Sequence, residues 1–80
     1  MDFRSLQYFI AVAQELNFTR AAEKLQMSQP PLSSQIKALE EELGVQLFIR
    51  GKRRLTLTEA GTLLLQRAVQ MMELSEKTEA

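Results

Sequence analysis

Apolar side chains recur at three- and four-residue intervals in residues 2–16. These positions are Phe3, Leu6, Phe9, Ile10, Ala13 and Leu16. Such a period predicts an amphipathic helix with one face on a hydrophobic core. We expect Asn17 to end this helix.

The next segment, residues 18–43, has the pattern of two short helices joined by a tight turn. Thr19 is a candidate N-cap of the first helix, and Ser28 is a candidate N-cap of the second. Ala21 and Ala22 are small enough to let another helix cross at close range. The segment therefore predicts a helix-turn-helix.

The second of these helices separates clearly into two faces at about 100° per residue. The expected buried stripe consists of Leu32, Ile36, Leu39 and Leu43. The outward arc consists of Gln29, Pro30, Ser33, Ser34 and Lys37. This arc carries no carboxylate, whereas residues 40–42 are all Glu and would repel phosphates. We expect the helix to enter a DNA groove by its N-terminal half.

The start of this helix has an unusual cap. An N-cap hydroxyl normally accepts a hydrogen bond from the second or third helical N–H. Those positions hold Pro30 and Pro31, which have no N–H. The Ser28 hydroxyl is therefore left for another partner, and we expect a DNA phosphate.

Beyond Gly44 the period changes to that of strands. Val45, Leu47 and Ile49 alternate with other residues, and a second short run covers residues 55–57. The tip between the two runs is strongly cationic and, with the preceding residue, supplies Arg50, Lys52, Arg53 and Arg54. A basic β-wing beside a helix-turn-helix suits contact with the DNA backbone or minor groove. The alternative is a solvated basic turn.

The last helix is expected to begin after Thr58, its N-cap, and to continue to about Glu76. It is apolar on more than one side, so part of it is expected to pack on a second copy of the chain. The candidate dimerisation residues are Leu64, Ala68, Met71 and Met72. The alternative is that this helix only closes the domain's own core.

Composition excludes several classes of function. The 80 residues suffice for one small domain. The chain has no Cys and no His, so no nucleophile–base pair, metal site or cofactor is expected, and an enzyme is excluded. No signal peptide and no run near the roughly 18 apolar residues of a membrane span is visible. We expect a cytoplasmic protein that does not enter membranes.

The net charge is zero, but the charges are segregated. Residues 18–39 sum to +2 and residues 50–54 to +4, so the remainder carries −6. A local basic patch is enough to attract phosphates. A protein-interaction module is the main alternative, and it would leave the basic tip unused. An RNA-binding domain is less favoured, because the aromatic residues sit at core spacing and form no stacking platform.

The chain closely resembles the N-terminal domain of LysR-type transcriptional regulators. Three motifs carry the resemblance and occur in this order: LQYFIAVAQELNFTRAAEKL, SQPPLSSQIKALEEELGVQLFIR and LTLTEAG. The resemblance covers almost the whole chain. It implies a mostly α fold with a small β-hairpin: a winged helix-turn-helix over residues 1–58, followed by a linker and dimerisation helix over residues 59–80. It also implies binding to a two-fold-symmetric operator in double-stranded DNA, a homodimer that becomes a tetramer in the full-length protein, and a small-molecule inducer bound only by a domain outside this chain.

The resemblance also assigns site residues by position. The recognition-helix positions that meet DNA in relatives correspond to Ser28, Gln29, Pro30, Pro31, Ser33, Ser34 and Lys37, and the wing corresponds to Arg50, Lys52, Arg53 and Arg54. Many relatives have Arg where this chain has Ser34. A hydroxyl cannot grip phosphate or pair with guanine as a guanidinium does, so the wing is expected to supply more of the affinity here.

Overall fold

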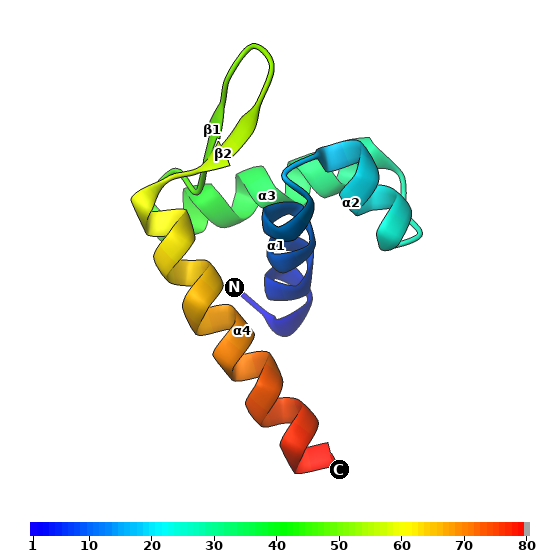
Figure 1. The fold of residues 1–80 in the computed structure, drawn as a ribbon, viewed down its shortest axis with the longest axis vertical. Coiled ribbons are helices and arrows are strands. Elements are labelled where there is room, and N and C mark those ends of the chain that lie inside the picture. The colour runs from blue at the N-terminus through cyan, green and yellow to red at the C-terminus, as the bar shows by residue number, and fades with distance from the viewer. Residues whose placement is uncertain (80) are drawn as a thin grey trace.

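The computed structural model describes the backbone of residues 1–79 and the side chains of residues 1–74. The elements in chain order are α1 (Phe3–Glu15), α2 (Phe18–Lys24), α3 (Gln29–Leu43), β1 (Phe48–Arg50), β2 (Leu55–Leu57) and α4 (Glu59–Glu79). Helices α1 to α3 pack together, the hairpin rises from one end of α3, and α4 runs back past α1 and projects beyond it (Figure 1). The predicted winged helix-turn-helix with a long last helix is confirmed.

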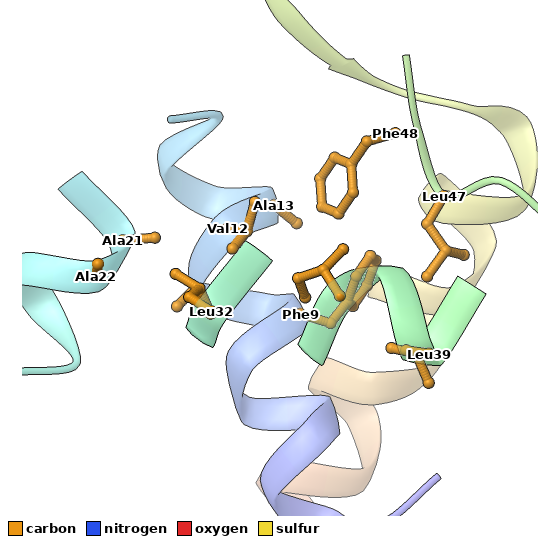
Figure 2. Close-up of a cluster of buried hydrophobic side chains, with 11 residues drawn as sticks. Phe9, Val12, Ala13, Ala21, Ala22, Leu32, Leu39, Leu47 and Phe48 are labelled. Carbon is orange, nitrogen blue, oxygen red and sulfur yellow. The ribbon is translucent and has the colours of Figure 1, made fainter. Parts of the chain in front are cut away.

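The core lies where α1 meets α2 and α3 (Figure 2). Phe9, Val12, Leu32 and Ile36 are fully buried there. The two small residues of α2, Ala21 and Ala22, are also buried, and both belong to the same core cluster. The buried stripe of α3 is as predicted for Leu32, Ile36 and Leu39, whereas Leu43 in the last turn is 37% exposed.

The helix boundaries around Asn17 differ from the prediction. Helix α1 stops one residue earlier, where Leu16 adopts the left-handed conformation with φ of 50°. Asn17 begins α2 instead of ending α1, because its side chain accepts a hydrogen bond of 2.9 Å from the Arg20 N–H. Thr19 is therefore inside α2 and is not its N-cap.

Helix α1 is capped by Asp2, whose carboxylate accepts a hydrogen bond of 2.8 Å from the Ser5 N–H. The hydrogen bonds from the Ser5 backbone and side chain lower the pKa of Asp2 below its ordinary value. Because the folded pKa is depressed, this cap stabilises the fold above the ordinary Asp range and is lost as the pH falls through the folded value.

The hairpin is shorter than the alternating pattern predicted. The strands pair antiparallel, with Phe48 opposite Leu57 and Arg50 opposite Leu55. Burial does not follow the alternation of Val45, Leu47 and Ile49 in the sequence: Leu47 and Phe48 are both buried, whereas Ile49 is 55% exposed. The reason is that the Phe48 ring inserts toward α1, where its centroid lies 5.5 Å from that of Phe9.

The junction of the hairpin and α4 is tightly bonded. The Thr58 hydroxyl accepts a hydrogen bond of 3.0 Å from the Gly61 N–H, as expected of an N-cap. The same hydroxyl donates a bond of 2.6 Å to the Gln46 carbonyl. Gly61 lies directly over the Leu47 backbone, and a Cβ on it would fall 2.1 Å from the Leu47 carbonyl oxygen. Only glycine allows α4 to approach this closely.

Helix α4 packs on the core through two of the candidate dimerisation residues. Ala68 is fully buried in the monomer, and Leu64 packs against the core cluster. These two side chains therefore pack inside the monomer, and their assignment to dimerisation stays a prediction. Met72 is half-buried beside α1. The exposed apolar residues of α4 are Leu63, Met71 and Leu74.

In the described part of the chain, no helix has the length and hydropathy to cross a bilayer.

The close contact at Gly61 leads to a stability prediction. Gly61→Ala would gain roughly 1 kcal/mol in helix propensity, but overpacking against the Leu47 carbonyl typically costs about 1–3 kcal/mol and rises with the overlap. Because the approach of 2.1 Å is far inside contact distance, we expect a net loss of about 1–2 kcal/mol in the free energy of unfolding, measured by urea denaturation. Gln66→Ala, at an exposed position of α4, is the control and should not destabilise the domain.

Candidate nucleic-acid interface

One edge of α3 and the tip of the hairpin face each other across a groove. We call the hairpin, residues 48–57, the wing, and residues 51–54 the wing tip. The groove residues from α3 are Gln29 and Ser33, which are one helical turn apart. The complete lining is Leu16, Asn17, Phe18, Gln29, Ser33, Arg50, Gly51, Arg53, Arg54 and Leu55. We call this the α3–wing groove.

The α3–wing groove is electropositive. Its lining contains three arginines and no carboxylate. Within residues 1–74 the ion pairs are those of the Met1 ammonium with Glu42 and of Lys24 with Glu15, so neither engages a wing cation. Three guanidiniums close to an amide and a hydroxyl can hold phosphate oxygens while polar groups meet base edges.

The other predicted site residues lie around this groove without lining it. Ser28, Pro30, Pro31 and Ser34 are exposed on the N-terminal half of α3, and Lys52 is exposed at the wing tip. Lys37 lines a second hollow on α3 together with Arg50, so Arg50 borders both hollows. The structure thus brings Gln29, Ser33 and the wing arginines together, with the remaining candidates on adjoining surface.

Ser28 is the N-cap of α3, as predicted, and its side chain makes no cap hydrogen bond. Gln29 is the first residue of the helix, which places Pro30 and Pro31 at the second and third positions. Since neither proline has an N–H, the Ser28 hydroxyl lacks the two donors from which an N-cap side chain normally accepts. It is exposed beside the α3–wing groove.

The position of Arg50 depends on a residue that the sequence did not single out for function. The Arg50 guanidinium carbon lies 5.0 Å from the centroid of the Phe18 ring, at cation–π distance. The Phe18 ring in turn packs on Phe48, with centroids 6.1 Å apart. Phe18 therefore connects Arg50 to the core. Sequence alone indicated only an apolar residue near the start of α2.

Glu40 is the second residue that sequence reasoning missed. Its Oε2 accepts hydrogen bonds from the backbone N–H groups of Leu47, at 2.7 Å, and Phe48, at 3.3 Å. Residues 40–42 are three consecutive glutamates whose carboxylates could pair with the cations of the wing. Glu40 instead bonds the wing's backbone. Nothing in the sequence distinguishes Glu40 from Glu41 and Glu42, because only the fold shows which of them faces the wing.

A helix-turn-helix that carries an electropositive wing beside its second helix is the architecture of a double-stranded DNA-binding domain. The comparison with protein families agrees: residues 3–62 match the model described as bacterial regulatory helix-turn-helix protein, lysR family. The chain belongs to this family and is a LysR-type DNA-binding domain. Because the family is one of regulators, the expectation that the chain is not an enzyme is confirmed.

Individual relatives support the same assignment. The Hca operon transcriptional activator HcaR of Escherichia coli is 58% identical over 76 residues, which are 95% of this chain and 26% of the relative. A crystal structure of the CbnR DNA-binding domain with DNA matches with a TM-score of 0.91 and 46% identity, over 99% of this chain and 91% of that one. The BenM DNA-binding domain with benA site 1 DNA matches with a TM-score of 0.93 and 46% identity, over 98% and 88%.

The chain covers a small share of the curated relatives and most of the solved DNA-binding domains. The chain spans 26% of the length of the first curated relatives, but about nine-tenths of the solved DNA-binding domains. It therefore corresponds to the DNA-binding part of a LysR-type regulator.

The unbonded Ser28 hydroxyl gives a prediction about stability. Replacing an N-cap residue by Ala usually costs about 1 kcal/mol. We expect Ser28→Ala to change the free energy of unfolding by less than about 0.3 kcal/mol, because no cap hydrogen bond is lost. Asn17→Ala, which removes the bond to the Arg20 N–H, is the matched comparison and should cost about 1 kcal/mol. Equal losses in urea denaturation would contradict this assignment of the two caps.

Proposed function

We propose that this chain binds double-stranded DNA sequence-specifically, with α3 in the major groove by its N-terminal half and the wing on the backbone or in the minor groove. The observation that carries the proposal is the α3–wing groove. Gln29 and Ser33 line it from the helix, and Arg50, Arg53 and Arg54 line it from the wing. The helix thus offers groups that read base edges, and the wing offers cations for phosphates.

The proposed contact set divides by chemistry. Gln29 can bond adenine bidentately, Ser33 and Ser34 can bond several base edges, and the Ser28 hydroxyl is open to a phosphate. Because Ser34 has no guanidinium, the wing carries more of the affinity. The full set is Ser28, Gln29, Pro30, Pro31, Ser33, Ser34, Lys37, Arg50, Lys52, Arg53 and Arg54.

Relatives support the binding of double-stranded DNA. Solved structures of the CbnR and BenM DNA-binding domains contain DNA, and HcaR is named as an activator of an operon. From the resemblance to LysR-type regulators we also infer that the whole regulator acts in the bacterial cytoplasm. Its inducer is a small molecule held by a domain outside this chain, and its full-length form is a tetramer.

The chain is further proposed to form a homodimer through α4 and to bind a two-fold-symmetric operator. The support is the apolar surface that α4 leaves exposed. Leu63 is 54% exposed, Met71 43% and Leu74 65%. Of the dimerisation residues expected from the sequence, Met71 lies on this surface and Met72 borders it; Leu63 and Leu74 extend it.

The proposal predicts different effects for the two parts of the site. Replacing both Arg53 and Arg54 by Ala removes phosphate contacts. The affinity for all duplexes should fall, and the slope of log K against log salt should become less negative by about 0.9 for each phosphate lost. Gln29→Ala should instead cost about 1–3 kcal/mol on the preferred site and little on random sequence. Fluorescence anisotropy on both duplexes across a salt series measures both effects.

Two outcomes would contradict this division. Equal losses on cognate and scrambled DNA for Gln29→Ala would mean that Gln29 does not read bases. If the unsubstituted chain does not bind a duplex even at low salt, fusion to an ectopic dimerisation helix distinguishes the remaining possibilities. Failure of the fused dimer would refute DNA binding and favour a protein-interaction module.

The dimer proposal is tested without DNA. Introducing Leu63→Glu together with Met71→Glu places charges on the exposed face of α4, where burial in an interface would be costly. We expect the dimer dissociation constant, measured by sedimentation equilibrium, to rise at least about tenfold. Gln35→Glu, at an exposed position of α3, is the control and should leave the dissociation constant unchanged. An unsubstituted chain that is monomeric at tens of micromolar would contradict a strong dimer.

A further inference from the structure

Glu40 is an acidic residue on the side of α3 that faces the wing. It lies eleven residues beyond Gln29, about three helical turns, and so belongs to the same edge of the helix. In open solution a carboxylate there would repel phosphates. The side chain is instead half-buried, and its Oε2 accepts from the N–H groups of Leu47, at 2.7 Å, and Phe48, at 3.3 Å. These are the residues at which the chain enters the wing.

The start of α4 also bonds the segment at which the chain enters the wing, on the side away from Glu40. We call residues 46–48 the wing root. The Thr58 hydroxyl donates a hydrogen bond of 2.6 Å to the Gln46 carbonyl, and the Thr58 N–H donates one of 3.0 Å to the Leu47 carbonyl. The wing root is therefore bonded to α4 through its carbonyls and to α3 through its N–H groups. Glu40 supplies the α3 side of this clamp.

We propose that Glu40 is a positioning residue for DNA binding, and that its carboxylate sets the angle of the wing relative to α3. This inference rests on the proposed function of the wing. The wing tip is four or five residues beyond the root, about 15 Å along an extended chain. A tilt of about 10° at the root would move the tip by about 2–3 Å, which is enough to break a hydrogen bond to phosphate.

Two conservative substitutions separate positioning from charge. Glu40→Gln removes the charge but keeps an acceptor oxygen at the same reach. Glu40→Asp keeps the charge but shortens the side chain by one methylene, so the carboxylate no longer reaches both N–H groups. If Glu40 acted only through its charge, Gln would strengthen DNA binding and Asp would leave it unchanged. Positioning predicts instead that Gln leaves DNA binding nearly unchanged and that Asp weakens it.

The first measurement is fluorescence anisotropy of the purified chain on a random-sequence duplex across a salt series. We expect Glu40→Asp to weaken binding about tenfold at roughly 0.1 M salt and to make the salt slope less negative by about one to two. Glu40→Gln should bind within about threefold of the unsubstituted chain, since the two N–H groups keep an acceptor. The matched control is Glu41→Asp, which makes the same change at an exposed position of α3 and should have no effect.

Loss of fold cannot imitate this result, because a smaller folded fraction lowers the apparent affinity without changing the number of phosphates engaged. Amide hydrogen exchange without DNA gives an independent reading of the clamp. The Leu47 and Phe48 N–H groups should lose protection in Glu40→Asp and keep it in Glu40→Gln. Unchanged protection in Glu40→Asp would overturn the clamp itself.

A double-variant test separates this inference from the proposed function. With Arg53 and Arg54 both replaced by Ala, adding Glu40→Asp should weaken binding by less than about twofold, because two of the three wing-tip cations that it positions are already absent. A full additive loss, or binding by Glu40→Gln alone that is more than about threefold tighter, would overturn positioning. If the two arginine replacements by themselves leave binding unchanged, the wing contact fails, and this inference fails with it. If they weaken binding while Glu40→Asp does not, only the positioning role is refuted.

Discussion

The burial of Phe48 is the contact on which the arrangement of the site depends. A hairpin of two three-residue strands is too small to be stable alone. Phe48 is 1% exposed, and its ring lies between those of Phe9 and Phe18. Burying a side chain of this size contributes about 1.5–3 kcal/mol, and paired aromatic rings add about 0.5–1.5 kcal/mol. This contact seats the wing on the helices and thereby gives the arginines a fixed base.

A chain of zero net charge can still present a strongly cationic surface when its charges are segregated. The acidic residues of α3 lie in its C-terminal half, and the three consecutive ones have different surroundings. Glu40 is bonded to the wing root, Glu42 pairs with the Met1 ammonium, and Glu41 is exposed beside the second hollow. The N-terminal half of the same helix has no acidic residue. A phosphate backbone that approaches the N-terminal half of α3 and the wing therefore meets positive charge, although the net charge of the chain is zero.

Much of the fold follows from the order of apolar and polar residues. The stripe of Leu32, Ile36 and Leu39, the turn at Gly44 and the cap at Thr58 are local features, and the structure contains each of them. The facing of residues 45–49 was not predictable in this way, because it depends on the space between α1 and α2 that the Phe48 ring fills. The buried side of α4 depends likewise on the rest of the domain. The periodicity of apolar residues shows how many faces of a helix or strand are apolar. It does not show which of these faces packs against an element that is distant in the sequence.

The candidate site shows the same limit. Sequence placed its arginines, serines and Gln29 on a helix and a wing, and the α3–wing groove brings five of these residues together. Two other residues support them through contacts with the wing and its root. Phe18 contacts Phe48 and Arg50, which are 30 and 32 positions further along the chain, and Glu40 bonds the backbone N–H groups of Leu47 and Phe48. Glu40 is one of three consecutive glutamates, and Phe18 is one of the five aromatic residues of the chain. Each acquires its role only when the wing folds back onto α2 and α3.

The stacking of Arg50 on Phe18 also affects the entropy of association. A free arginine side chain carries about 2 kcal/mol of rotamer entropy, part of which is lost when it grips a ligand. Arg50 is restrained on an aromatic face at 5.0 Å before any ligand arrives, so less of its freedom remains to be lost. The exposed cations of the wing tip have no such ring beneath them among the described contacts. The wing thus combines one preorganised guanidinium at its base with cations at its tip that are free to adapt to the local course of a backbone.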